Sequence, residues 1–301
     1  MRVFALILAA CAASTLNWSG PAHSAPAASA VTAEERLPHI SVQSIGKGSP
    51  VVLIPGLSTP RGVWDGVAPQ LAKNHQVILV QVNGFAGDDA GANLKPGVLT
   101  GIVEDLHSYI ASHRLGRVRV IGHSMGGLAT LMLAKANPGD VDQAMVVDAL
   151  PFFAVLMDPS ASANSVKPMA EMMRAKVASG YGKPADPATV EANVKSLALK
   201  PESIARMKTW AAAANPRVTA QALYEDLTTD IRPDLGGIAT PVTLIVPWTD
   251  ARFGEERTLA FYKRQYEALP KATFVGIGDA GHFVMLDQPA AFGAAVEAFV
   301  K

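Results

Sequence analysis

The chain has 301 residues, of which 49% are hydrophobic and 17% charged, and its formal net charge is +0. This length suits one large α/β domain or two small ones, with enough apolar residues for a core. The neutral charge and the aromatic content of 6% argue against a basic, base-stacking surface for nucleic acid.

The first thirty residues have the layout of a secretory signal peptide. Met1-Arg2 is a short basic start, an apolar run covers 3–16, and an alanine-rich stretch with A-x-A sites covers 17–30. The apolar run is shorter than the roughly 20 residues of a membrane span, so we expect export to the bacterial periplasm or the medium. Cys11, the single cysteine, would leave with this leader. The alternative is that 8–11 is a lipoprotein box and Cys11 anchors the protein.

Short apolar segments alternate with amphipathic ones between residues 31 and 150. An edge strand is predicted at 40–45, and buried strands at 51–54, 76–80, 118–121 and 144–147. Helices are predicted at 61–73 and around 99–110, and a third follows the glycine-rich turn at 122–127 and runs to 137. This alternation is typical of a mainly parallel sheet covered by helices on both faces.

The strand pattern disappears between Pro151 and Pro233. Apolar residues at helical spacing, interrupted by prolines, predict four helices there. We interpret 151–233 as a helical cap inserted between two parts of one core, 31–150 and 234–301. The second part contains predicted strands at 242–246 and 273–277, a helix at about 255–269 and a closing helix that begins at Pro289.

Gly122-His123-Ser124-Met125-Gly126 has the G-x-S-x-G spacing of a nucleophile elbow. A serine at the apex of such a strand-to-helix turn has a strained backbone, and its hydroxyl stands clear of the sheet. Glycines two positions before and after the serine let the strand and helix approach closely. The motif alone also fits an ordinary tight connection, so the rest of the chain has to decide.

A serine nucleophile needs a base for its proton, and the base needs an acceptor that fixes its tautomer. Ser124, Asp148, Asp250 and His282 all follow predicted strands, whose carboxyl ends meet at one edge of a parallel sheet. His282 leaves the last strand on a glycine-bounded loop, and we predict that it is the base. We favour Asp250 as the acid because it directly follows a strand and precedes His282. Asp148 also ends a strand and is the rival.

With these residues in place, the chain resembles the cap-bearing serine hydrolases of the α/β-hydrolase superfamily. The order Ser124, Asp250, His282 is the serine–acid–histidine order of that fold. The resemblance extends over about 49–301 and rests on the strand ends at Pro55-Gly56-Leu57, Gly122 to Gly127, Asp250 and Gly281-His282-Phe283.

The resemblance implies an α/β-hydrolase fold: a mostly parallel, doubly covered sheet with an inserted helical cap. It also implies an oxyanion hole made by the backbone amides of Leu57 and Met125. Two positions depart from the common pattern. Pro55 stands where relatives commonly have histidine, and Pro247 where they commonly have a glycine three residues before the acid.

We therefore expect a serine esterase that cleaves a small, largely apolar ester through an acyl-enzyme, without cofactor or metal. The same triad acting on an amide, a lactone, a thioester or a C–C bond, or forming a peracid, stays open. A capped pocket that only binds a ligand is a further alternative. The expected partner is a small-molecule substrate, with no nucleic acid and no membrane span, and the oligomeric state is open.

Overall fold

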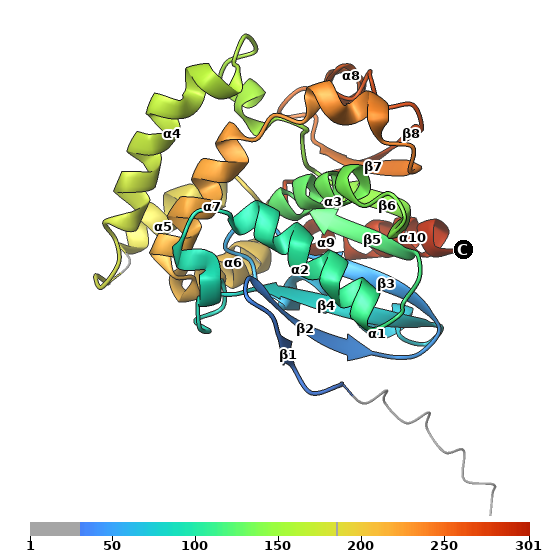
Figure 1. Cartoon of the computed structure of the whole chain (residues 1–301). Helices are drawn as coiled ribbons and strands as arrows, with labels where there is room; N and C mark the ends of the chain where they lie inside the picture. The colour runs from blue at the N-terminus through green and yellow to red at the C-terminus, as the bar shows by residue number, and fades with distance from the viewer. Residues whose placement is uncertain (1–30, 185) are drawn as a thin grey trace, which may run out of the picture.

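A computed structural model of the chain describes residues 31–184 and 186–301, so the signal peptide predicted at 1–30, with Cys11, lies outside the described residues. The described chain is built on an eight-stranded sheet of order β1-β2-β4-β3-β5-β6-β7-β8 (Figure 1). The first two pairings, β1 with β2 and β2 with β4, are antiparallel, and the others are parallel. The strands are β1 (Glu35–Arg36), β2 (Ile40–Ile45), β3 (Ser49–Ile54), β4 (His75–Val82), β5 (Val118–His123), β6 (Val141–Val147), β7 (Val242–Trp248) and β8 (Ala272–Gly278).

Helices cover both faces of the sheet, as its apolar strands predict. Successive side chains of a strand point to opposite faces, so Val52 and Ile54 of β3 join one hydrophobic core while Val51 and Leu53 join the other. This confirms the predicted α/β-hydrolase fold, with its mostly parallel sheet. The first core packs against α2 (Val98–Ser112), α3 (Met125–Ala136) and α8 (Gly254–Gln265), and the second against α1 (Ala68–Leu71), α9 (Val284–Asp287) and α10 (Pro289–Val300).

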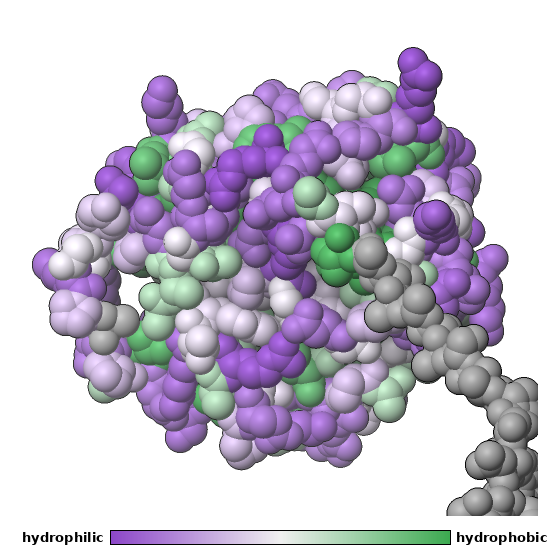
Figure 2. Space-filling model, turned by 90° about the horizontal axis from the view of Figure 1, so that it is seen from below, coloured by the Kyte–Doolittle hydropathy of each residue, from purple (hydrophilic) through white to green (hydrophobic). Residues whose placement is uncertain are grey.

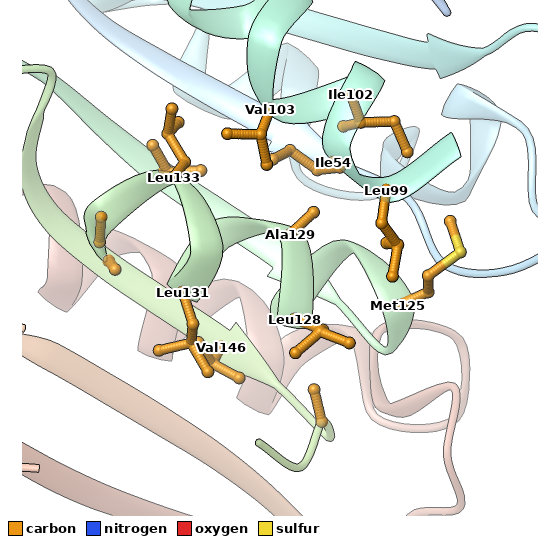
Figure 3. Packing of buried hydrophobic residues seen from close by; sticks show 14 of the residues in the cluster. Ile54, Leu99, Ile102, Val103, Met125, Leu128, Ala129, Leu131, Leu133 and Val146 are labelled. Atoms are coloured by element: carbon orange, nitrogen blue, oxygen red, sulfur yellow. The ribbon is translucent and has the colours of Figure 1, made fainter. Parts of the chain in front are cut away.

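The helix that follows Ser124 is held on two sides. Leu99 of α2 lies next to Met125 at the start of α3, and Leu131 of α3 lies next to Val146 of β6 (Figure 3). These four side chains are at most 1% exposed. Close packing of this kind resists displacement, so the turn before α3 is fixed by the core on both sides.

Between β6 and β7 the described residues form four α-helices, besides two short 3-10 turns, and we call the four α-helices the cap. They lie together at one end of the sheet, on the left of Figure 1. Prolines begin three of them, where the missing N–H costs no helical hydrogen bond. The cap helices are α4 (Ala163–Ala178), α5 (Pro187–Lys195), α6 (Pro201–Ala213) and α7 (Pro216–Thr228).

The continuous helix predicted over 61–73 is wrong. The structure has a 3-10 turn at Arg61–Trp64 and, after a break, the short α1 at Ala68–Leu71. Gly66 favours other backbone conformations, and Pro69 has no N–H to continue a helical ladder. Trp64 and Leu71 are nevertheless buried in the second core, so the apolar pattern marked the correct face.

The face drawn in Figure 2 is mostly hydrophilic, and its hydrophobic residues are scattered in separate spots. Within residues 31–184 and 186–301, no helix has the length and apolar character needed to cross a bilayer.

Candidate active site

Ser124 lies at the apex of the turn between β5 and α3, with φ 55° and ψ −126°. Its backbone N–H donates to the carbonyl of Val147 at 2.9 Å, which ties the turn to β6. A Cβ atom on Gly122 would lie 2.2 Å from the carbonyl oxygen of Gly126, and one on Gly126 would lie 2.5 Å from that of Ile54. The turn therefore has the geometry of a nucleophile elbow, and its two flanking glycines are required by space.

The loop after β3 passes directly beside this elbow. A Cβ atom on Gly56 would lie 3.0 Å from the Cβ of Ser124. Leu57 follows Gly56, and Ser58 then adopts a left-handed φ of 52°. Among the loop and turn hydrogen bonds of the described residues, none is donated by the amides of Leu57 or Met125. Two backbone donors beside one serine are the arrangement that stabilises an oxyanion.

His282 lies on the loop after β8, and its Nδ1 is 2.6 Å from Oδ2 of Asp148. Asp148 directly follows β6, with a left-handed φ of 44°, and its N–H donates to the carbonyl of Ile245 at 2.9 Å. A carboxylate can only accept this bond, so Nδ1 of His282 carries the proton. The other ring nitrogen, Nε2, then has a lone pair and can act as a base.

The structure does not bring Asp250 to His282, and the favoured pairing of these two residues is wrong. Asp250 is exposed. The carbonyl of Thr249 accepts hydrogen bonds from the amides of Arg252 and Gly254, each at 3.1 Å, and this tight turn directs Asp250 to solvent. Asp148, the rival, occupies the position next to the histidine.

Tyr262 of α8 and Tyr266, which caps the end of that helix, support Asp148 and its neighbour Ala149, and the sequence analysis missed both. Tyr262 donates its hydroxyl proton to Oδ1 of Asp148, and Tyr266 donates to the carbonyl of the neighbouring Ala149 at 2.8 Å. Burial raises the pKa of Tyr262 well above its usual value, and the negative charge of Asp148 adds to that rise. Tyr262 therefore stays a neutral donor. The signal in the sequence is the spacing of four residues between Tyr262 and Tyr266, which places both side chains on one side of the last turn of α8 and its cap.

His123, beside the nucleophile, is fully buried and contacts the histidine loop. Its Nε2 lies 3.0 Å from the backbone carbonyl of His282, and the two imidazole rings are 4.5 Å apart between centroids. Burial lowers the pKa of His123 well below its usual value, and the charge of His282 lowers it further. His123 is therefore a neutral donor that holds the backbone of His282.

Asp287 is a second support of the histidine loop. It is completely buried, and it accepts hydrogen bonds from the amides of Gly281 at 2.9 Å, Leu199 at 2.9 Å and Lys200 at 3.3 Å. Leu199 and Lys200 belong to the connection between α5 and α6. One carboxylate thus fastens the loop before His282 to the cap.

An open cavity of about 990 Å³ lies between the four cap helices and the loop after β4, which contributes Gly87 and Asp88. Met173, Tyr181 and Asn193 are among its lining residues, and neither Ser124 nor His282 is. This cavity is separate from the candidate active site.

The chain is similar in sequence to several named proteins and similar in fold to several solved structures. A pimeloyl-[acyl-carrier protein] methyl ester esterase of Nitrosomonas europaea is 26% identical over 268 residues, which are 86% of this chain and 98% of the relative. A protein of Cronobacter turicensis, provisionally named carbamate hydrolase RutD, is 34% identical over 102 residues, or 34% of this chain. That match covers 38% of the relative's own length. A thermophilic esterase of Thermogutta terrifontis has the same fold, with a TM-score of 0.73 and 20% identity over 89% of this chain and 98% of that one.

The family assignment rests on a longer match. The model of the alpha/beta hydrolase family matches residues 51–295, which include the elbow, Asp148, the cap and His282. The match therefore covers most of the chain and all of the candidate active site. The chain belongs to the alpha/beta hydrolase family.

Proposed function

We propose that the protein is a serine hydrolase that cleaves a carboxylic ester through an acyl-enzyme. Nε2 of His282 takes the proton of Ser124 while Oγ attacks the ester carbonyl, and the amides of Leu57 and Met125 bind the oxyanion. His282 then gives the proton to the leaving alcohol. Finally, His282 takes a proton from water while the water oxygen attacks the acyl-enzyme, and it returns that proton to Oγ of Ser124 as the carboxylic acid leaves.

One relationship carries this proposal: a strained serine at the elbow and a histidine whose Nδ1 is held by a partly buried carboxylate lie at the same edge of the sheet. Asp148 stabilises the imidazolium that forms when His282 accepts the serine proton. Because Tyr262 also donates to Asp148, the carboxylate is fixed in orientation before substrate binds.

The two backbone amides supply the electrostatic part of the proposal. Met125 is the first residue of α3, so its N–H points along the positive end of the helix dipole. Loss of one such preorganised donor costs about 2.7–4 kcal/mol of transition-state stabilisation in comparable enzymes. Substitution of a side chain does not remove a backbone donor, so the test of the proposal addresses the serine.

An ester is the favoured bond, because the relative that matches over nearly its whole length is named as a methyl ester esterase. The relative named as a carbamate hydrolase favours the C–N bond of a carbamate as a second candidate, but its match covers a third of this chain. Both reactions use the same nucleophile and oxyanion, and they differ in the leaving group that His282 protonates.

The proposal is tested by labelling the protein with a fluorophosphonate and by measuring turnover of p-nitrophenyl esters of increasing chain length. We expect label on Ser124 and turnover that Ser124→Ala abolishes. Ser112→Ala is the matched control, because Ser112 is an exposed serine at the far end of α2.

Turnover that survives in Ser124→Ala, or label that stays off Ser124, would contradict the proposal. An ethyl carbamate assayed beside the corresponding ester distinguishes the two candidate bonds, since the ester should have the larger kcat/KM.

A further inference from the structure

Helix α7 of the cap spans the candidate active site from one side to the other. We call the loop after β3, with Gly56, Leu57 and Ser58, the oxyanion loop. Near the start of α7, Thr219 Oγ1 lies 2.7 Å from Oγ of Ser58 in this loop. Just beyond its end, the amide of Ile231 donates to the carbonyl of Pro151 at 3.0 Å, three residues after Asp148. The helix therefore joins the loop of the oxyanion donors to the strand end that carries the acid.

The rotation of α7 about its axis is set by Glu225. This carboxylate accepts hydrogen bonds from the amides of Gly97 at 2.7 Å and Leu99 at 2.8 Å, at the N-terminus of α2, beside which α7 lies in Figure 1. Successive helix residues are about 100° apart, so the next residue, Asp226, faces a different direction. It lies seven positions after Thr219, two turns along the face that touches the oxyanion loop.

Asp226 is a buried carboxyl group without a partner. The residue is 7% exposed, and no side chain or backbone group of the described chain donates a hydrogen bond to its carboxyl group. Among the described residues, the polar side-chain atoms that are both inaccessible and without a hydrogen-bond partner do not include the carboxyl oxygens of Asp226. Since these oxygens have no partner, they retain some accessible surface. Buried polar groups are normally hydrogen-bonded, and the exception here lies on the same face of α7 as Thr219, which contacts the loop of the proposed oxyanion donors.

The charged groups around α7 explain why Asp226 stays unpaired. Arg174 of α4 is bonded to Glu171 and Gln221, Arg217 stacks on Tyr181, and Arg232 is paired with Asp230. Burial raises the pKa of the Asp226 carboxyl to about 7, and the positive charge of His282 acts in the opposite direction. The charged group that acts on the Asp226 carboxyl is thus His282, the proposed catalytic base.

We propose that Asp226 binds the substrate by a hydrogen bond to an uncharged hydroxyl group carried by the ester. This inference rests on the proposed function. The substrate donor is uncharged because His282 becomes an imidazolium during the reaction, and a second cation beside it would be repelled. The substrate class is therefore a hydroxyl-bearing ester.

The test compares ethyl butanoate with two hydroxylated esters, ethyl 3-hydroxybutanoate and 2-hydroxyethyl butanoate, which place the hydroxyl on the acyl and the alcohol side. For the wild type we expect a larger kcat/KM for at least one hydroxylated ester. Asp226→Leu should lower that kcat/KM by roughly tenfold or more, the effect of one lost hydrogen bond to a buried carboxyl. Turnover of ethyl butanoate should be kept, and Asp226→Asn should retain most of the preference because its amide oxygen still accepts.

Glu202→Gln, which changes an exposed carboxylate of α6, is the matched control and should leave the preference unchanged. An equal loss for all three esters in Asp226→Leu would overturn the inference, because it would indicate a role in the fold or in imidazolium stabilisation. A wild type without any preference for a hydroxylated ester would overturn it even if Asp226→Leu failed to fold. If Ser124 is labelled and esters are turned over, these outcomes refute the role of Asp226 alone. An unlabelled Ser124 refutes the proposed function and, with it, this inference.

Discussion

Asp148 holds Nδ1 of His282 at 2.6 Å although 134 residues separate the two in the sequence. The whole cap lies between them along the chain, since Asp148 directly follows the strand before the cap and His282 follows the last strand. The acid is thus attached to the segment from which the cap departs.

Asp148→Asn should lower kcat by about 10³- to 10⁴-fold, because an amide cannot stabilise the imidazolium of His282 and does not select its tautomer. Asp250→Asn should leave kcat close to that of the wild type, since Asp250 is an exposed turn residue. Steady-state kinetics with a p-nitrophenyl ester measures both. The opposite ranking of the two variants would restore Asp250 as the acid.

Tyr262→Phe should lower both activity and stability. Of the two side-chain donors that the described residues supply to Asp148, the substitution removes one, and it leaves a partly buried carboxylate oxygen without a partner. Loss of such a partner costs about 1–3 kcal/mol of unfolding free energy, and a less well oriented acid reduces kcat more than it changes KM. Urea unfolding and steady-state kinetics check the two effects. Tyr181→Phe, at an exposed tyrosine of the cap, should change neither.

Gly122→Ala should destabilise the protein by about 1–3 kcal/mol or more, because the added methyl group has no room. It would lie 2.2 Å from the carbonyl of Gly126 and 2.3 Å from the hydroxyl of Thr130. Gly139→Ala is the matched control, since a methyl group there meets no atom within 4 Å. Thermal unfolding of the two variants gives the comparison, and equal melting temperatures would show that the elbow tolerates a side chain.

The sheet could be predicted because its strands are buried on both faces. A run such as Val51 to Ile54 is apolar at every position, and the structure divides it between two cores. The elbow could be predicted because Gly122, Ser124 and Gly126 lie within five consecutive residues. The close approach of strand and helix that requires the two glycines is therefore a local property of the sequence. The break between Trp64 and Ala68 was missed because apolar spacing indicates the buried face and does not report whether the backbone ladder is continuous.

The acid could not be chosen from the sequence. Asp148 and Asp250 both follow strands, and they differ in features that only the folded chain has. The carboxylate of Asp148 accepts a hydrogen bond from the hydroxyl of Tyr262 in α8. The amides of Arg252 and Gly254 instead donate to the carbonyl of Thr249 and close a turn in which Asp250 is exposed. The partners of Asp148, Tyr262 and His282, lie more than a hundred positions away in the sequence. The turn that exposes Asp250 is closed by residues at most four positions after it.

His123→Gln should make the protein less sensitive to acid. The pKa of His123 is lowered in the folded chain from its usual 6.5, so the folded state resists protonation while the unfolded state accepts a proton. The wild type is fully stabilised by this group above pH 6.5, and it loses that stability as the pH falls through 6.5 towards the lowered value, by at most about 1.4 kcal/mol per pH unit. Glutamine cannot be protonated, and its amide can still donate to the carbonyl of His282. Urea unfolding at pH 8 and pH 5 should therefore show a larger loss for the wild type than for His123→Gln. All other ionisable groups are common to both proteins and cancel in this difference, so an equal loss would mean that His123 accepts a proton in the folded state.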